Sequence, residues 1–139
     1  MAEAVFRKLA SDRGVLDQFR IESRGTGAWH VGDGADPRMV ALGQTHAVDL
    51  TGHVVRQVSP QDLRDFDVVL AMDRHNLRDL QSLGVARGRE IVLMRAYDTE
   101  DTEPDVPDPY RDGPEGFEHV YQILLRSCGS LLDDLLKGE

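Results

Sequence analysis

Both ends of the chain carry apolar residues at a helical period. Ala2, Val5, Phe6 and Leu9 stand at positions i, i+3, i+4 and i+7, which predicts an amphipathic helix from the first residues. No Ser, Thr, Asp or Asn precedes this helix to satisfy its first amide groups. A longer stripe of the same period predicts a final helix, and its members are Phe117, Val120, Tyr121, Leu124, Leu125, Cys128, Leu131, Leu132, Leu135 and Leu136.

Three segments between these helices have the patterns of strands. Phe19–Ser23 alternates apolar and polar residues, which is typical of a half-buried strand. Asp67–Met72 and Glu90–Met94 are instead almost continuously apolar. Such runs are typical of strands that are covered on both faces of a parallel sheet. We therefore predict three strands at these positions.

Capping residues mark where further helices begin. Asp36 precedes Pro37, and Ser59 precedes Pro60, so each pair offers an N-cap residue followed by proline at the first helical position. Asp73 precedes a third amphipathic stretch. The sequence thus predicts three internal helices, which alternate with the strands.

This alternation predicts one α/β domain, residues 1–139, built as a three-layer sandwich around a parallel sheet. In such folds each helix normally connects two strands of the sheet. The opening helix has a predicted strand after it and none before it. We therefore expect that the first central strand of the sheet is missing from this chain.

Composition and charge narrow the class of protein. The formal net charge of −9 argues against a nucleic-acid partner, because phosphate backbones favour basic surfaces. No apolar run approaches the ~20 residues of a membrane span. The single cysteine, Cys128, fits a reducing cytoplasm, so we expect a cytoplasmic protein. The five histidines lack metal-ligand spacing, and we expect no metal and no other cofactor.

The stretch DVPDPYRDG holds a carboxylate on a stiff backbone. Asp108 lies between Pro107 and Pro109, which restrict its backbone, and Tyr110 follows. A carboxylic acid fixed beside an aromatic ring suits the protonation of a leaving oxygen. Asp and Pro are also ordinary residues of surface turns. The residues alone leave both interpretations open.

A glycine-rich loop follows the first predicted strand. Gly25 and Gly27 begin like a dinucleotide-binding motif, but His30 replaces the third glycine and no helix follows, which excludes that motif. Trp29 lies on this loop and is either an anchor in the core or the wall of a pocket.

Cys128 is a candidate nucleophile by residue type alone. It lies on the apolar stripe of the final helix, between Leu125 and Leu132. A free cysteine in that setting usually behaves as a small buried apolar residue. No basic partner or helix N-terminus is evident that would lower its pKa. We therefore interpret Cys128 as structural.

Taken in order, several stretches resemble the low-molecular-weight protein tyrosine phosphatases. They are MAEAVFRKL, IESRGTGAWHVG, ADPRMV, GHVVRQVS, FDVVLAMDRHNLRDL and DVPDPYRDGPEGFEHVYQ. The resemblance runs almost from end to end. It implies a flavodoxin-like, phosphotyrosine phosphatase I-like fold. It also implies hydrolysis of phosphotyrosine in proteins, or of aryl phosphates, through a cysteinyl-phosphate intermediate.

The resemblance also implies roles for individual residues. Asp108 matches the general acid that protonates the departing phenolic oxygen and then activates water. Trp29 and Tyr110 match aromatic residues that flank the substrate ring. Ser23 and His53 match positions that hydrogen-bond the phosphate-binding loop and support its shape.

In the family, the first central strand leads into a loop that holds the nucleophilic Cys and the phosphate-binding Arg. This chain begins just after that loop, so the resemblance implies an N-terminal truncation that removes both groups. Cys128 cannot replace them, because Asp134 and not Arg lies six residues further on. We expect a phosphatase in the full-length form and no activity in this chain. The alternative is a non-catalytic, phosphatase-like binding domain or remnant.

Two further expectations concern the surface. Arg24 and Arg111 depart from the family pattern; they either add positive charge at the mouth of the pocket or are simple surface residues. Without the first strand, the edges of Phe19–Ser23 and Asp67–Met72 would be exposed. Since exposed strand edges pair readily with other chains, we expect self-association through them.

Overall fold

A computed structural model describes residues 1–26, 32–34, 36–84, 91–108 and 113–137. Its helices are α1 (Ala2–Asp12), α2 (Pro37–Thr45), α3 (Pro60–Asp65), α4 (Arg74–Leu83) and α5 (Gly113–Lys137), with short 3₁₀ helices η1 (Leu16–Gln18) and η2 (Met94–Tyr97). Its strands are β1 (Leu70–Ala71) and β2 (Val92–Leu93). The helices at both ends, and those after Asp36, Ser59 and Asp73, are confirmed.

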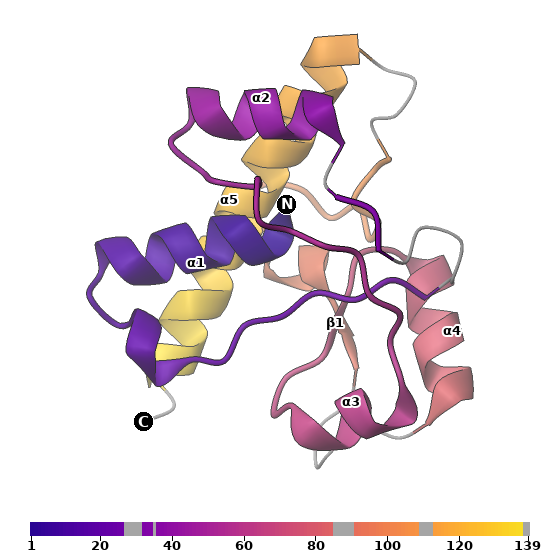
Figure 1. The fold of residues 1–139 in the computed structure, drawn as a ribbon. Coiled ribbons are helices and arrows are strands. Elements are labelled where there is room, and N and C mark those ends of the chain that lie inside the picture. Colours follow the sequence, from indigo (N-terminus) through magenta and orange to yellow (C-terminus); the bar gives the residue numbers. More distant parts are fainter. Residues whose placement is uncertain (27–31, 35, 85–90, 109–112, 138–139) are drawn as a thin grey trace.

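The sheet is small and parallel. Leu70 pairs with Val92 and Ala71 with Leu93, in one two-stranded sheet. Helices α1 and α5 pack together on one side of β1, whereas α4 packs on the sheet from the other side, close to α3 (Figure 1). The α/β class with a parallel sheet is therefore confirmed.

The predicted strands are longer than the observed ones. Within Asp67–Met72 only Leu70–Ala71 is a strand, and within the described part of Glu90–Met94 only Val92–Leu93 is. Met94 begins η2 instead, and Glu90 lies outside the described residues. The prediction of a strand at Phe19–Ser23 is wrong, because none of the described segments pairs with its backbone. Among the described residues, pairing begins at Gly25, which bridges Gln57.

The internal helices begin as their capping residues predict. The Asp36 carboxylate accepts a hydrogen bond from the amide of Arg38 at 2.8 Å, and Asp73 accepts one from Asn76 at 2.7 Å. Ser59 and Asp62 exchange side-chain and backbone hydrogen bonds in a capping box. Helix α1 has Met1 at its N-cap position and no side-chain cap, as the sequence indicated.

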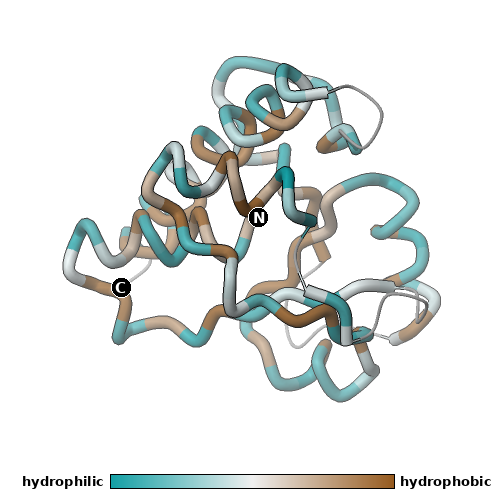
Figure 2. Tube along the Cα trace, turned by 45° about the horizontal axis from the view of Figure 1, so that its top comes forward, coloured by the Kyte–Doolittle hydropathy of each residue, from teal (hydrophilic) through white to brown (hydrophobic). Residues whose placement is uncertain are grey.

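Most of the buried core lies between α1 and α5. Nine buried residues form this cluster: Val5, Phe6, Ala10, Met94, Val120, Leu124, Cys128, Leu131 and Leu132. A second cluster, between α3, β1 and α4, contains Leu63, Ala71 and Leu80. Figure 2 shows apolar stretches of the trace turned toward the interior and polar stretches on the outer turns. The two clusters lie on opposite sides of a cavity.

Candidate active site

A cavity of about 1240 Å³ separates the segment 19–26 from the segment that contains β1. Residues 18–26 line one wall, and residues 65–73 line the other. The start of α1 and the inner face of α5 close it on one side, through Phe6, Leu124 and Cys128 among others. Leu63 of α3 and Leu80 of α4 contribute to the opposite side.

The carboxyl end of segment 19–26 is hydrogen-bonded to the start of α1, whereas the residue after β1 is hydrogen-bonded to Val106. At the end of segment 19–26, the Ser23 hydroxyl donates a hydrogen bond to Glu3 at 2.9 Å. At the end of β1, the carbonyl oxygen of Met72 accepts one from the amide of Val106 at 2.8 Å. Pro107 and Asp108 follow Val106 and line the cavity. In open α/β folds, ligands bind at this edge of the sheet.

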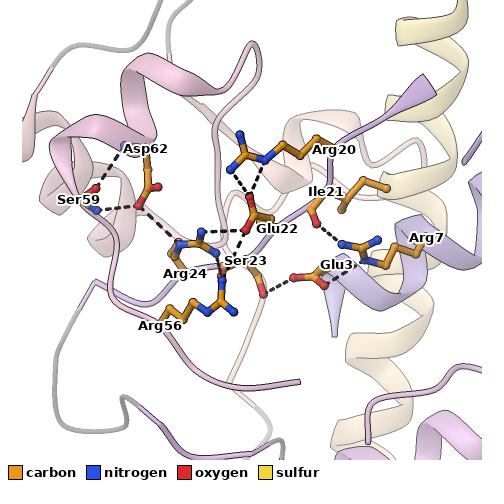
Figure 3. A network of polar contacts seen from close by, with 10 residues as sticks. All are labelled: Glu3, Arg7, Arg20, Ile21, Glu22, Ser23, Arg24, Arg56, Ser59 and Asp62. Atoms are coloured by element: carbon orange, nitrogen blue, oxygen red, sulfur yellow. Dashed lines mark hydrogen bonds and ion pairs between the residues drawn. The ribbon is translucent and has the colours of Figure 1, made fainter. Parts of the chain in front are cut away.

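Glu3 contacts Ser23, one of the predicted site residues, and Arg7 (Figure 3). Its carboxylate accepts hydrogen bonds from Ser23 and, at 3.1 Å, from Arg7 Nε. Burial alone would raise the pKa of Glu3, but these hydrogen bonds and the positive charges of Arg7 and His53 outweigh it and lower the pKa. His53 and Glu3 also line one small pocket of about 190 Å³. Glu3 is therefore ionised at neutral pH, accepts a hydrogen bond from Ser23 and is close enough to His53 for their charges to interact.

Arg24 belongs to an ion-pair network beside the cavity (Figure 3). Its guanidinium contacts Glu22 at 2.9 Å and Asp62 at 3.6 Å, and its side chain is 17% exposed. Arg20 and Arg56 also contact Glu22, at 2.9 and 3.7 Å. The hydrogen bond from Arg24 lowers the pKa of Glu22. Arg24 thus lines the cavity, but acidic neighbours offset its charge.

Cys128 is enclosed by the main core. It is 1% exposed, and its thiol donates a weak hydrogen bond to the carbonyl oxygen of Ala2 at 3.8 Å. Burial raises the pKa of the Cys128 thiol to about 12. The nucleophilic form is the thiolate, which is negligible at neutral pH for such a group. The buried position of Cys128 agrees with its interpretation as a structural residue.

The described residues thus bring together part of the predicted site. Asp108 and Ser23 line the cavity, Ser23 donates a hydrogen bond to Glu3, and His53 lines a small pocket together with Glu3. Trp29, Tyr110 and Arg111 lie outside the described residues. Sequence reasoning missed Glu3 as a common neighbour. Its place four residues before Arg7 on a helix was a visible signal for that ion pair, but its contact with Ser23 was not.

Two classes of feature are missing from the part of the chain that the structure describes. No group of three or more His, Cys, Asp or Glu side chains is arranged to hold a metal ion there. Among the described helices, none combines the length and the apolar character needed to cross a membrane.

Comparisons with known proteins agree on one family. The family model "Low molecular weight phosphotyrosine protein phosphatase" matches residues 1–139. The pig protein of that description is 40% identical over 136 residues, which cover 96% of this chain and 85% of the relative. The Bacillus subtilis phosphatase YfkJ is 36% identical over 138 residues, covering 99% and 87%.

Solved structures give the same result. A crystal structure of a protein tyrosine phosphatase from Entamoeba histolytica matches with a TM-score of 0.91 and 31% identity, covering 99% of this chain and 88% of that one. The structure of YfkJ matches with a TM-score of 0.89. The chain belongs to the low-molecular-weight phosphotyrosine protein phosphatase family.

Proposed function

We propose that this chain provides the scaffold and the general acid of an enzyme that hydrolyses phosphotyrosine in proteins. The observation that carries the proposal is the position of Asp108. It lines the cavity two residues after Val106, whose amide is hydrogen-bonded to Met72 just after β1, and Met1 and Glu3 at the start of α1 line the same cavity. In this proposal the phosphate ester lies at the N-terminus of α1, which favours anions, and Asp108 is the acid on the lining of the same cavity.

In the proposed reaction a thiolate attacks phosphorus, and Asp108 gives its proton to the departing phenolic oxygen. Water then attacks the cysteinyl phosphate, the Asp108 carboxylate takes a proton from that water, and phosphate leaves as the thiolate re-forms. Trp29 and Tyr110 would flank the phenyl ring. Ser23 and His53 would support the phosphate-binding loop, and their shared neighbour Glu3 is consistent with that role.

The nucleophile is the part that these 139 residues do not supply. Their one cysteine, Cys128, is buried with a raised pKa, and no Arg stands six residues after it. We infer that the reactive Cys and the phosphate-binding Arg come from a segment outside these residues, and that the chain alone is inactive. For the chain alone, the same observation favours a second function, a non-catalytic binding domain.

Hydrolysis of a phosphotyrosine peptide tests the proposal. We compare the 139-residue chain with a chimera in which the residues before the matched region of the pig relative are joined to Met1. We expect background turnover from the chain and clear turnover from the chimera. In the chimera, Asp108→Asn lowers kcat by about 100-fold or more, the range for loss of a general acid.

Glu103→Gln is the matched control, since it removes another carboxylate from the same loop away from the cavity. Equal losses in both variants would contradict the role of Asp108. Robust turnover by the short chain, abolished by Cys128→Ser, would contradict the inference about the nucleophile. A phosphoarginine peptide belongs in the same assay, because a Drosophila structure titled arginine phosphatase is 32% identical to this chain.

A cytoplasmic location is part of the proposal, supported by the single reduced cysteine of the chain. Fractionation of cells that produce the tagged protein tests it; recovery with an oxidising compartment would contradict it.

Self-association through strand edges stays a prediction, and light scattering of the purified chain at micromolar concentration measures it.

A further inference from the structure

The segment that leads to Asp108 is held at its first two residues. The carbonyl oxygen of Asp105 accepts a hydrogen bond from Arg95 Nη1 at 2.9 Å. The amide of Val106 donates one to the carbonyl oxygen of Met72 at 2.8 Å. Asp108 lies two residues after Val106, so these two contacts set the position from which its backbone starts.

Arg95 and Arg74 both contact this segment, and Arg95 is the buried one. The side chain of Arg95 is 3% exposed, whereas that of Arg74, which pairs with the Asp105 carboxylate, is 61% exposed. Water competes with an exposed ion pair, so the contact of Arg74 adds little rigidity. The guanidinium of Arg95 is shielded from that competition, and its hydrogen bond constrains the backbone of Asp105 directly.

The same guanidinium also holds the loop that comes before Asp105. Its Nη2 atom contacts Asp98 at 3.3 Å and Asp101 at 2.8 Å. Within the described ranges, no hydrogen bond between two backbone groups involves residues 99–105. The order of this loop therefore depends on side chains, and Arg95 contacts the loop at its start, in its middle and at its end.

Stability alone is a poor explanation for the burial of Arg95. Its Nε atom is buried and has no hydrogen-bond partner among the described residues. A buried charge is costly to desolvate, and apolar side chains of similar volume are often as stabilising as a buried ion pair. Arg126 already ties Asp98 to α5, at 3.0 Å. What Arg95 adds is a fixed position for the backbone of Asp105.

We propose that Arg95 is a positioning residue for Asp108, because its guanidinium fixes the backbone at Asp105 and so places the Asp108 carboxyl for proton transfer to the leaving oxygen. The inference rests on the proposed function of Asp108. Arg95 is not one of the described residues that line the cavity, so it acts only through the acid. Misplacement of a reacting group by about 1 Å can cost about 100-fold in rate.

The kinetic test uses the chimera of this chain with the N-terminal residues of the pig relative, and two substrates. A phosphotyrosine peptide has a leaving group that needs a proton, whereas dinitrophenyl phosphate releases a stable phenolate without one. We compare kcat/KM, which covers the steps up to departure of the phenol. Arg95→Met should lower it about tenfold or more for the peptide and less than about twofold for the dinitrophenyl ester.

Further variants separate positioning from stability. Arg95→Lys keeps the charge but replaces the fork by a single ammonium, so it should show the same selective loss with a smaller loss of stability. Arg126→Gln is the matched control, because it removes another guanidinium from Asp98 and none of its described contacts involves residues 105–108. It should leave the ratio between the two substrates unchanged. In an Asp108→Asn background, Arg95→Met should cause no further selective loss.

Hydrogen exchange of the 139-residue chain gives a second measurement. Arg95→Met should speed exchange of the Val106 amide by a factor about tenfold larger than that of the Leu131 amide in α5, since it releases one segment rather than the whole fold. Arg126→Gln should change both amides by similar factors. Similar factors in Arg95→Met would mean that Arg95 only stabilises the fold, and they would overturn the inference.

The kinetic outcomes distinguish this inference from the proposed function. If the chimera has no turnover, or if Asp108→Asn slows both substrates equally, the proposed function fails and the inference fails with it. If Asp108→Asn is selective for the peptide and Arg95→Met is not, only the role of Arg95 is overturned. A further selective loss in the double variant would also overturn that role.

Discussion

The two sides of the cavity are packed very differently. The α1–α5 side holds nine buried core residues, whereas the α3–α4 side holds three. Helix α5 is 25 residues long, and its apolar stripe covers α1 and η2 at once. Helices α3 and α4 have 6 and 10 residues and rest on strands of two residues each.

This difference shows where each side obtains its stability. Helices α1 and α5 pack directly on each other, so the burial of apolar side chains on this side does not depend on the length of the strands. The α3–α4 side packs against a sheet. Because each strand of that sheet has only two residues, few side chains are available to be buried against it. We therefore expect substitutions of the same kind to cost more on the α1–α5 side.

A matched pair of leucines gives the largest expected effect. Leu132 is fully buried, and Leu132→Ala should lower the free energy of unfolding by about 4 kcal/mol, within the range for enclosed leucines. Leu63 is also buried but lines the cavity, so fewer contacts are lost and Leu63→Ala should cost about 2 kcal/mol.

Urea unfolding followed by circular dichroism measures both values. Equal costs would mean that the cavity is closed in solution. A larger cost for Leu63 than for Leu132 would reverse the comparison between the two sides.

The ion pairs that fasten η2 to α5 give the next effect. Asp98 has no exposed side-chain surface and contacts Arg126 at 3.0 Å and Arg95 at 3.3 Å. The hydrogen bond from Arg126 is the main reason that the pKa of Asp98 falls to about 2. Because the folded pKa lies below the unfolded value, the stabilisation is present above about pH 4 and is lost as pH falls toward 2.

Asp98→Asn should therefore cost about 2 kcal/mol at pH 7, and the difference from the parent chain should shrink between pH 4 and pH 2. Thermal or urea unfolding across this pH range measures it. Asp105→Asn is the control, because that carboxylate pairs with the exposed Arg74 and should shift the midpoint far less. A difference that stays constant with pH would contradict the role of Asp98.

The capping box of α3 allows the stability of the α3–α4 side to be tested separately. The amide of Asp62 donates to Ser59 Oγ at 3.3 Å, and the Ser59 amide donates to the Asp62 carboxylate at 2.9 Å. Ser59→Ala should cost about 1 kcal/mol. Ser59→Asp keeps an acceptor and should stay close to the parent in urea unfolding. Equal losses in both variants would show that the cap is not the cause.

An exposed ion pair on α1 gives the smallest expected effect. Lys8 and Asp12 are four residues apart and 2.9 Å from each other, and both side chains are exposed to solvent. Lys8→Ala should change the free energy of unfolding by about 0.5 kcal/mol or less. A loss above about 1 kcal/mol in the same assay would mean that the Lys8 stem packs on the core.

The helices were predictable because their signals are local. The N-cap Ser59 with the proline after it, and the apolar stripe of α5, each favour a helix through residues that are close together in the sequence. A strand depends on its neighbours. The alternating pattern of Phe19–Ser23 is a strand pattern, yet no described strand pairs with it, and it stays an extended segment.

The candidate site was predictable only through residues with a distinctive local setting. Asp108 was found because two prolines hold it, and it does line the cavity. Glu3 has an ordinary place on an amphipathic helix, and only the fold brings Ser23 and His53 to it. The pairing of Arg24 with Glu22 and Asp62 likewise joins separate segments, which no spacing in the sequence indicates.

The burial of the single cysteine also has a practical consequence for labelling. A thiol that is 1% exposed, with a pKa of about 12, reacts negligibly with maleimides at neutral pH. The native chain therefore serves as a cysteine-free background without any substitution in its core. A cysteine introduced at the exposed Val54 would take a single fluorophore or spin label at a defined position.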